Sequence, residues 1–394
     1  MRIGIITFWK SDDNYGQQMQ MYALQYYLRS IGHDAYLIRY DPTQKMGFFS
    51  FLKRGVKKAL KSSALLAIPS LRLKIKNEKK KQELKEWNKK VNVKREFLKF
   101  QNKNIIMSDK IYHSYSELRK EPPVADAYIT GSDQVWHDSL FLNKTAGFFL
   151  QFGANNIKRI AYAASIGREI KENEYSILKK WLSTFTAISV REESACLECK
   201  HVGRFDAITT IDPTCLLSPK HYKSMMQKPK EPFTPYVFMY ILNVDKTEDT
   251  GWLLVEEYIR EKGWKVKTVA SSGYEPACEL IPNNWNILAT IPQWLGLIEC
   301  SEGVVTTSFH GMIFSILFHR PFLVVLLSSR HARANTRITH ILSLLDLSNR
   351  IMKKNESMAH QMDSPIKWEL VDKRIGELRE KGCDFLKQAL TDNL

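Results

Sequence analysis

Residues 2–8, Arg2-Ile3-Gly4-Ile5-Ile6-Thr7-Phe8, form an apolar run of the kind that makes a strand buried on both faces of a parallel sheet. A polar loop over residues 10–16 follows. Residues 17–30 then carry apolar side chains at three- and four-residue spacing, which predicts a helix. The next apolar run covers residues 35–40. Strand, helix and strand in this order predict a parallel βαβ unit with a right-handed crossover.

The same alternation continues through both halves of the chain, and three prolines within residues 228–235 mark a linker between them. Further strands are expected at residues 127–130, 160–163, 187–190, 208–211, 236–241, 265–269, 303–307 and 322–325. This pattern predicts an α/β protein of two doubly wound, Rossmann-like domains that face a cleft. We expect the first domain at residues 1–227, the second at 228–364, and a C-terminal helix at 365–394 that packs back on the first domain.

The chain of 394 residues has 58 Lys and Arg against 42 Asp and Glu, a net charge of +16 that would ordinarily suggest a nucleic-acid partner. The excess is regional, because residues 53–103 alone hold 18 Lys and Arg and four Glu. We interpret residues 48–103 as a basic helical insertion whose lysines and apolar side chains suit an anionic membrane surface. A solvated insertion is the alternative. RNA is disfavoured, since aromatic side chains for base stacking are sparse between residues 53 and 85.

Neither a signal peptide nor a membrane-spanning segment is expected. Residues 1–6 read directly as a strand, and the longest apolar stretch, residues 312–327, is interrupted by His319-Arg320-Pro321. The pair Cys196 and Cys199 has no second ligand pair that would complete a metal site, and no glycine-rich nucleotide fingerprint occurs. The sequence thus predicts a cytoplasmic protein of bacterial type, and it contains no clear signature of a metal site or of nucleotide binding.

One candidate site is Ser308-Phe309-His310-Gly311, which lies between a predicted strand and an apolar helix. The N–H groups and the dipole at the start of that helix favour a phosphate or a carboxylate. His310 would donate a proton or a hydrogen bond to such an anion. A tight turn with a structural histidine is the alternative.

Other candidates also follow predicted strands, where ligands of open α/β sheets bind. Arg191 suits a planar anion, or else forms a surface pair with a neighbouring glutamate. Residues 131–137 gather Ser132, Asp133, Gln134 and Trp136, which suit a sugar through hydroxyl hydrogen bonds and ring stacking. Asp133 would also accept a proton from a hydroxyl. Asn14-Tyr15-Gly16 occupies an equivalent place after the first strand, although both segments also suit ordinary turns.

Taken together, these segments resemble the polysaccharide pyruvyl transferase family. The resemblance covers about residues 1–350 in family order, with the basic insertion as the main unmatched part. It rests on Asn14-Tyr15-Gly16, Tyr22-Ala23-Leu24-Gln25, Gly131-Ser132-Asp133-Gln134-Val135-Trp136, Tyr162-Ala163-Ala164-Ser165-Ile166-Gly167, Ser189-Val190-Arg191-Glu192-Glu193-Ser194, Asp212-Pro213-Thr214 and Thr307-Ser308-Phe309-His310-Gly311.

The resemblance implies a GT-B-like fold and transfer of pyruvate from phosphoenolpyruvate to a sugar as a ketal, with phosphoenolpyruvate as co-substrate and no cofactor. It implies catalytic roles for His310 and Asp133, with Asp133 as the base on the acceptor side. Where some family members carry an arginine, this chain has Ser308. Arg333 or Arg337 would replace that charge, and Arg337 is favoured because the family often has Asn-x-Arg-Ile there. The implied donor-binding residues are Arg191, Ser308, Gly311 and Arg337, and the implied acceptor-binding residues are Asn14, Tyr15, Gly16, Ser132, Gln134 and Trp136.

Family acceptors include sugars on a polyprenyl diphosphate at the cytoplasmic face of the membrane, in capsule or exopolysaccharide assembly. The expected product is a 4,6-ketal on a terminal hexose such as galactose, made by a peripheral enzyme that the basic insertion holds at the membrane. Two alternatives stay open. One is a nucleotide-sugar glycosyltransferase of the GT-B fold acting on the same acceptors, and the other is a non-catalytic protein that binds anionic polymers.

Overall fold

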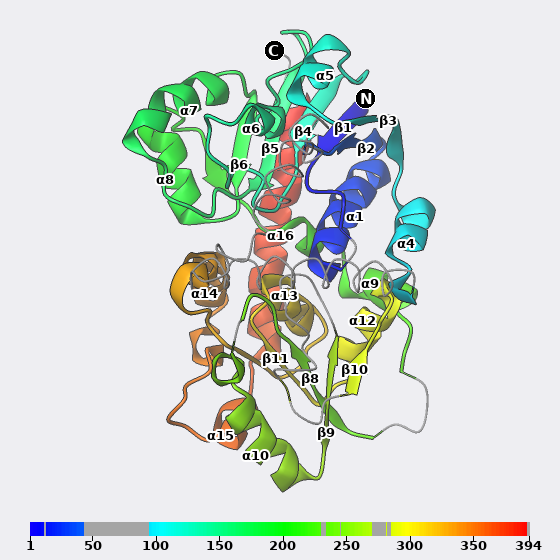
Figure 1. Ribbon diagram of the computed structural model, residues 1–394, viewed down its shortest axis with the longest axis vertical. Helices are drawn as coiled ribbons and strands as arrows, with labels where there is room; N and C mark the ends of the chain where they lie inside the picture. Colours follow the sequence, from blue (N-terminus) through cyan, green and yellow to red (C-terminus); the bar gives the residue numbers. More distant parts are fainter. Residues whose placement is uncertain are drawn as a thin grey trace, which may run out of the picture.

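The computed structural model describes residues 1–11, 13–42, 94–229, 234–244, 246–269, 281 and 285–391. Most of the predicted basic insertion, residues 48–93, lies outside these described residues. The described chain forms two α/β domains stacked one above the other, with helices on both sides of each sheet (Figure 1). The prediction of two Rossmann-like domains of the GT-B type is therefore confirmed.

The first sheet has seven strands in the order β3-β2-β1-β4-β5-β6-β7, all parallel. Its interior strands are apolar on both faces, because their alternate side chains enter different apolar clusters on the two sides of the sheet. The bounds are β1 (Arg2–Ile6), β2 (Asp34–Tyr40), β3 (Met107–Tyr112), β4 (Ala127–Thr130), β5 (Lys158–Ala164), β6 (Ala187–Val190) and β7 (Ile208–Thr209).

The second sheet has five parallel strands in the order β10-β9-β8-β11-β12. The strand order of each sheet reverses beside its first strand, at β1/β4 and at β8/β11, and such reversals are where α/β sheets bind ligands. The bounds are β8 (Tyr236–Tyr240), β9 (Lys265–Val269), β10 (Trp285–Ile287), β11 (Gly303–Thr306) and β12 (Phe322–Val324).

Helices connect the strands, and several begin at the residues that capping chemistry favours. Asn14 caps the first helix and Ser308 caps the helix that holds His310, each through its side-chain oxygen. The helices are α1 (Tyr15–Ser30), α4 (Phe97–Asn104), α5 (Tyr115–Lys120), α6 (Asn143–Phe148), α7 (Tyr175–Leu182), α8 (Glu193–His201), α9 (Pro219–Met225), α10 (Trp252–Lys262), α12 (Ile291–Glu299), α13 (Phe309–Leu317), α14 (Thr336–Leu344), α15 (Met358–Met362) and α16 (Trp368–Thr391).

The two domains share one apolar core, and Tyr15 at the start of α1 is its central contact. Its ring stacks on Trp294 with the centroids 5.4 Å apart, and its edge meets the ring of Tyr240. Its hydroxyl donates a hydrogen bond of 2.7 Å to the carbonyl oxygen of Ala289. All of these partners belong to the second domain, so the first turn of α1 holds the two domains together.

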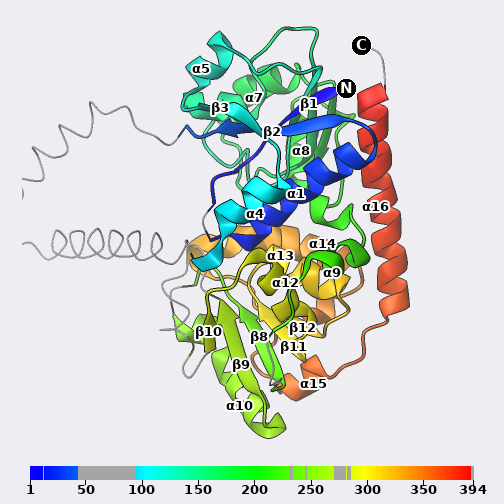
Figure 2. The ribbon, with the colours of Figure 1, turned by 90° about the vertical axis from the view of Figure 1, so that its right-hand side faces the viewer.

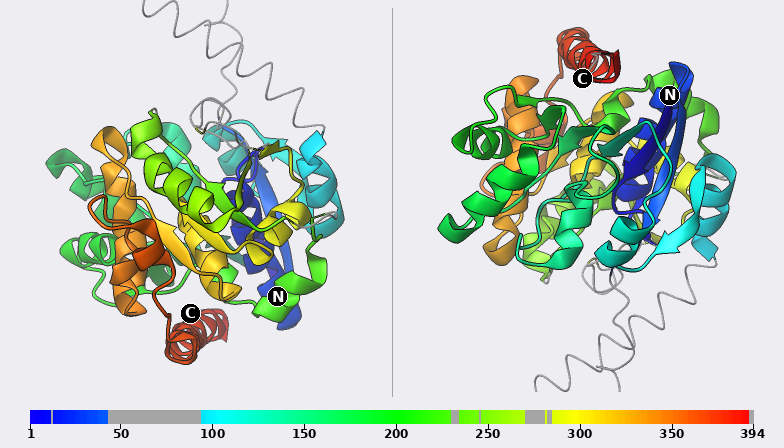
Figure 3. Two further views of the ribbon diagram at one scale, coloured as in Figure 1. Left: turned by 90° about the horizontal axis from the view of Figure 1, so that it is seen from below. Right: turned by 90° about the horizontal axis from the view of Figure 1, so that it is seen from above.

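Helix α16 runs along both domains on the outside of the molecule (Figures 2 and 3). Trp368 near its beginning stacks on His319 of the second domain, with the ring centroids 4.8 Å apart. Arg379 donates a hydrogen bond to the carbonyl oxygen of Cys215, and near the helix end Leu390 accepts one from Lys158 of β5. The 24 residues of α16 span about 36 Å, which allows one helix to contact both domains.

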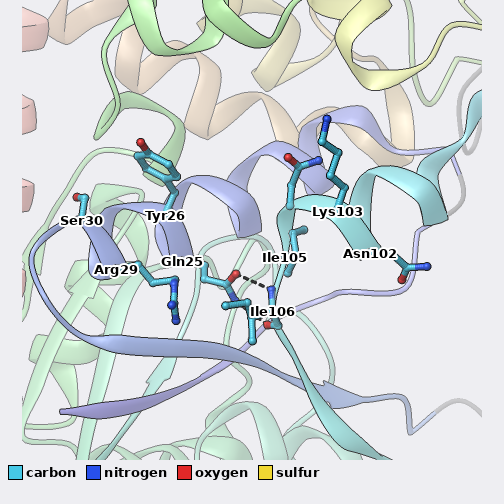
Figure 4. Close-up of a pocket in the computed structure, with 9 residues that line it drawn as sticks. Gln25, Tyr26, Arg29, Ser30, Asn102, Lys103, Ile105 and Ile106 are labelled. Carbon is cyan, nitrogen blue, oxygen red and sulfur yellow. Dashed lines mark hydrogen bonds between the residues drawn. The ribbon is translucent and has the colours of Figure 1, made fainter.

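After the basic segment, the described chain returns through α4, which packs beside α1. The amide of Gln25 donates to the carbonyl oxygen of Ile106 and accepts from its N–H (Figure 4). A cavity of about 380 Å³ lies here, lined by Tyr26 and Lys103 among others (Figure 4). It adjoins the C-terminal half of α1, away from the ends of the strands where the candidate residues gather.

Replacing Tyr15 tests how strongly this contact holds the domains together. We expect Tyr15→Ala to lower the free energy of unfolding by about 3–5 kcal/mol, because it removes a buried ring. Tyr15→Phe loses only the hydroxyl bond and should cost about 1 kcal/mol. Denaturant unfolding followed by circular dichroism measures both. Tyr26→Ala, at a half-exposed tyrosine of the same helix, is the matched control, and an equal loss there would contradict the assignment.

Candidate active site between the two domains

The centre of the site is the carboxylate of Asp212, which is completely buried just after β7. Its Oδ2 atom accepts hydrogen bonds from Arg191 at 3.0 Å and from the Ser132 hydroxyl at 2.9 Å. Its Oδ1 atom accepts from the backbone N–H and the hydroxyl of Thr214 at 3.0 and 2.7 Å. The Nε2 atom of His310 lies 3.6 Å from Oδ2. One carboxylate therefore gathers the predicted catalytic residue His310, the predicted donor-binding residue Arg191 and the predicted acceptor-binding residue Ser132.

The topology of the sheet explains why these residues meet. Ser132 follows β4, Arg191 follows β6 and Asp212 follows β7, so all three stand at the carboxyl ends of parallel strands of one sheet. His310 is the second residue of α13 and comes from the second domain. The site therefore exists only where the two domains meet.

Glycine at position 16 allows α1 to approach this histidine. A Cβ atom on Gly16 would lie 2.2 Å from Nδ1 of His310, closer than any real contact of that kind. Gly311 is constrained in the same way, because its Cβ would lie 2.5 Å from the Thr306 hydroxyl oxygen and 2.9 Å from the ring of Tyr240. These two glycines set the position of His310 between the domains.

Burial and charge act against each other on Asp212. Burial alone would raise the pKa of its carboxyl, but the neighbouring charges of His310 and Arg191 and the hydrogen bond from the Thr214 N–H hold it well below its usual range. Asp212 therefore remains ionised at neutral pH. It acts as a fixed negative charge that orients Arg191 and faces His310, not as a proton donor.

Two arginines flank the ring of Phe309. The guanidinium carbons of Arg191 and Arg337 lie 4.9 and 5.8 Å from its centroid. Within the described residues, no hydrogen-bond acceptor reaches Nε and Nη2 of Arg191 or Nε of Arg337, although these atoms are buried. Burial and repulsion by Arg191 lower the pKa of Arg337 to about 10, so the Arg337 side chain is still charged at neutral pH. Unpartnered cationic donors of this kind are the groups that carboxylates and phosphates bind in proteins.

The structure also distinguishes between the two arginines considered as replacements for the charge missing at Ser308. Arg337 projects from α14 to the ring of Phe309, as described above. Arg333 is exposed and pairs with Glu169 at 3.2 Å. Ser308 and Gly311 bond to each other, because the Ser308 hydroxyl accepts from the Gly311 N–H at 3.3 Å. Ser308 and Gly311 thus fix the first turn of α13. Direct contact of either residue with the donor substrate stays a prediction.

Trp136 and Tyr15 were predicted to touch the acceptor sugar, but both side chains are too deeply buried to do so. Trp136 is completely buried, its ring stacks on Phe149 at 4.6 Å, and its indole N–H donates to the carbonyl oxygen of Phe148, so it has no face for a sugar. Tyr15 is equally buried in the contact between the domains. Ser132 is buried as well, and its hydroxyl serves Asp212. Asn14 accepts from the N–H of Gln17 as the cap of α1.

Asp133 and Gln134 remain partly exposed beside the cluster. Asp133 has a φ of +90°, an uncommon conformation for a residue other than glycine, and its carboxylate accepts from the N–H of Gln134. Gln134 packs against Gly167. The loop at Gly167 is held by the buried carboxylate of Glu192, which accepts from the N–H groups of Ile166 and Gly167 at 3.0 and 3.3 Å. Glu192 thus positions the loop on which Gln134 rests.

Sequence reasoning did not assign roles to Asp212 and Glu192. Both lie within motifs that carried the resemblance, Asp212-Pro213-Thr214 and the segment around Arg191. The signal available was an acidic residue directly after a predicted strand. Among the described residues, no group of three or more His, Cys, Asp or Glu side chains is arranged to hold a metal ion.

Comparison with known proteins agrees with this arrangement. The family model for polysaccharide pyruvyl transferase matches residues 14–329. The chain belongs to this family. No curated protein sequence matches it. Across the part of this pyruvyl transferase family member that the structure describes, no helix is both long and apolar enough to cross a bilayer.

Solved structures resemble the chain along its whole length. A putative UDP-N-acetylglucosamine 2-epimerase from Listeria monocytogenes has a TM-score of 0.51 and 11% identity, over 100% of this chain and 98% of that chain. A UDP-GlcNAc 2-epimerase from Neisseria meningitidis bound to UDP-GlcNAc has a TM-score of 0.50 and 11% identity, over 98% and 100%. At such identities the likeness shows the shared two-domain fold alone.

The stability of the Asp212 cluster should depend on pH. Because the folded-state pKa of Asp212 lies below its unfolded value, the ionised carboxylate stabilises the fold above about pH 4, and this contribution is lost as the pH falls further. Asp212→Asn should lower the free energy of unfolding by about 3–5 kcal/mol at neutral pH. The difference in unfolding free energy between the variant and the wild type should become smaller as the pH falls below about 4. Denaturant unfolding at several pH values measures this difference.

The control is Asp206→Asn, which removes an exposed ion pair with Arg204 and should cost at most about 1 kcal/mol. A difference between wild type and Asp212→Asn that stays constant from neutral pH to pH 2 would contradict the ionised state of Asp212.

Proposed function

We propose that the protein transfers pyruvate from phosphoenolpyruvate to two hydroxyl groups of a sugar, forming a ketal and releasing phosphate. Membership of the polysaccharide pyruvyl transferase family supports a transferase of this class. The observation that carries the proposal is the pair Arg191 and Arg337, whose buried cationic donors lack partners beside His310. Phosphoenolpyruvate has a carboxylate and a phosphate, so it offers an anion to each arginine.

The reaction divides naturally among these residues. Protonation of the methylene carbon of phosphoenolpyruvate by His310 creates an oxocarbenium-like centre at the adjacent carbon, which one sugar hydroxyl attacks. Asp133 takes the proton of that hydroxyl. Phosphate then leaves with its bridging oxygen, and the second hydroxyl closes the ring and releases its own proton. Asp212 places its negative charge 3.6 Å from Nε2 of His310 and so holds a fixed counter-charge beside the proton donor.

The acceptor in this proposal is a sugar carried on a polyprenyl diphosphate, as in capsule or exopolysaccharide assembly, and the product is a 4,6-ketal on a terminal hexose such as galactose. The proposal includes peripheral binding to the cytoplasmic face of the membrane. The regional charge supports it, because residues 53–103 hold 18 Lys and Arg against four Glu.

Replacement of His310 tests the chemistry. We expect His310→Asn to lower kcat for pyruvate transfer by about 10²–10⁴-fold, because the proton donor is lost. The assay combines phosphoenolpyruvate with a polyprenyl-diphosphate sugar and detects both released phosphate and the mass of a pyruvate ketal. The matched control is His319→Asn, at a partly exposed histidine paired with Asp372, which should retain wild-type kcat.

Thermal shift separates this proposal from a glycosyltransferase that uses a nucleotide sugar. Phosphoenolpyruvate should raise the Tm of the wild type, and Arg191→Lys should abolish most of that rise because lysine cannot form the bidentate contact. Stabilisation by UDP-sugars and not by phosphoenolpyruvate would favour the glycosyltransferase. The proposal would be wrong if the wild-type protein transferred no pyruvate to galactose-, glucose- or N-acetylhexosamine-terminated acceptors.

Membrane association gives a further prediction. The protein should float with vesicles that contain anionic lipid. The bound fraction should fall as the salt concentration is raised from about 0.05 to about 0.5 M, because salt screens the attraction between the lysines and the lipid headgroups over this range. Deletion of residues 52–81 should abolish flotation. Neutral phosphatidylcholine vesicles serve as the control, and unchanged flotation of the deletion variant would show that the basic segment is not the membrane contact.

A further inference from the structure

A second cavity, of about 210 Å³, lies at the carboxyl ends of β1 and β2, on the same edge of the first sheet as the Asp212 cluster. Residues 8–10, which follow β1, and residues 40–42 at the end of β2 line one part of it. Gln17, the third residue of α1, lines it too, and its neighbour Gly16 touches His310. The cavity therefore borders the first turn of α1, whose Gly16 contacts His310, and shares none of the residues assigned to the donor.

The walls of the cavity are aromatic and fixed in place. The rings of Phe8 and Tyr40 both meet the ring of Phe148 edge-on, with centroids 5.1 Å apart in each case. The indole N–H of Trp9 donates to the carbonyl oxygen of Tyr40 at 3.0 Å, and the Tyr40 hydroxyl donates to the carbonyl oxygen of Lys144 at 2.8 Å. These hydrogen bonds use the polar ends of both side chains. Of the four rings at the cavity, Phe8 is the most exposed, while Trp9, Tyr40 and Phe148 present only their edges and small parts of their surface.

The charged groups at the cavity balance each other. Lys10 pairs with Asp41 at 2.8 Å, and Lys144 pairs with Asp138 at 2.5 Å. The Asp41 side chain is only 6% exposed whereas that of Lys10 is 55% exposed, so the carboxylate lies inside and the ammonium group at the rim. With each cation already neutralised by a carboxylate, the cavity does not favour a phosphate. Carboxylates and ammonium groups around aromatic walls do suit the hydroxyls and apolar faces of a neutral sugar.

The volume of the cavity and its place in the chain indicate what size of ligand it takes and which residues lie near it. Sites for drug-sized ligands measure about 300–1,000 Å³, so a cavity of this size takes a smaller ligand, such as one monosaccharide. Thr7, directly before the cavity residue Phe8, donates from its hydroxyl to the carbonyl oxygen of Ser132 at 2.8 Å, and Asp133 is the next residue. The segment after β1 that lines the cavity is thus hydrogen-bonded to the segment after β4 that carries Asp133, the residue assigned as the base.

We propose that this cavity is the subsite for the acceptor hexose, recognised as a neutral pyranose by aromatic walls and by the two ion pairs of Lys10 and Lys144. The role as acceptor subsite rests on the proposed function, whereas the binding of a neutral hexose does not. It assigns sugar recognition to residues after β1 and β2, in place of the buried Trp136.

Direct binding of sugars tests this subsite without phosphoenolpyruvate. The probes are methyl β-galactoside, methyl β-glucoside and methyl N-acetyl-β-glucosaminide, titrated in saturation-transfer NMR with irradiation of aromatic protons. We expect transfer to the ring protons of at least one of them in the wild type. Lys10→Ala and Asp138→Asn change partly exposed side chains, so the fold should persist, and each should raise the Kd about tenfold by removing a hydrogen bond to a charged group.

The matched control is Lys353→Ala, which removes an exposed lysine of an ion pair with Glu356 in the second domain and should leave the Kd unchanged. Absence of transfer in the wild type, or a Kd within twofold of wild type in either cavity variant, would overturn the subsite. Hexose binding that both variants weaken, in a protein without pyruvate transfer, would instead overturn the proposed reaction and leave the sugar subsite standing.

Discussion

A carboxylate that is removed from water must be surrounded by donors, and in this protein that requirement organises the site. Asp212 accepts four hydrogen bonds, from Arg191, Ser132 and Thr214, and lies beside His310. Because its partners come from the ends of different strands and from the other domain, its burial couples the two domains to one another. The loss of this charge would leave a buried guanidinium without a counter-charge and would disturb both domains at once.

The contact between the domains has two parts. An apolar part around Tyr15 stabilises the domain arrangement, and a polar part around Asp212 and His310 contains the candidate catalytic groups. Tyr15 supplies the apolar part through Trp294 and Tyr240, and the next residue, Gly16, supplies the close approach to His310. A single turn of α1 therefore carries both functions. This explains why a motif of three residues, Asn14-Tyr15-Gly16, contains a helix cap, an anchor and a glycine rather than three ligand contacts.

The sequence predicted the interior strands well, since apolar runs such as residues 2–6 are visible without knowledge of their neighbours. It did not predict β3 and β10, which are edge strands of mixed composition. His310, Arg191 and Arg337 were predicted because each follows a strand or matches a family motif, and the structure brings the three together around Phe309 and Asp212. Trp136 was misassigned and Asp212 received no role, because burial and pairing between distant segments depend on tertiary structure, which periodicity does not report.

Arg191 exposes only 1% of its surface, although two of its donor atoms lack partners. Because those atoms are closed off from solvent in this arrangement, an anion would reach them only in a form in which the contacts around Arg191 have opened. The dissociation constant measured in solution is then the intrinsic constant divided by the population of that form. Contacts such as Tyr15 on Trp294, which touch no ligand, therefore weaken apparent donor binding in the same proportion as they stabilise the closed arrangement.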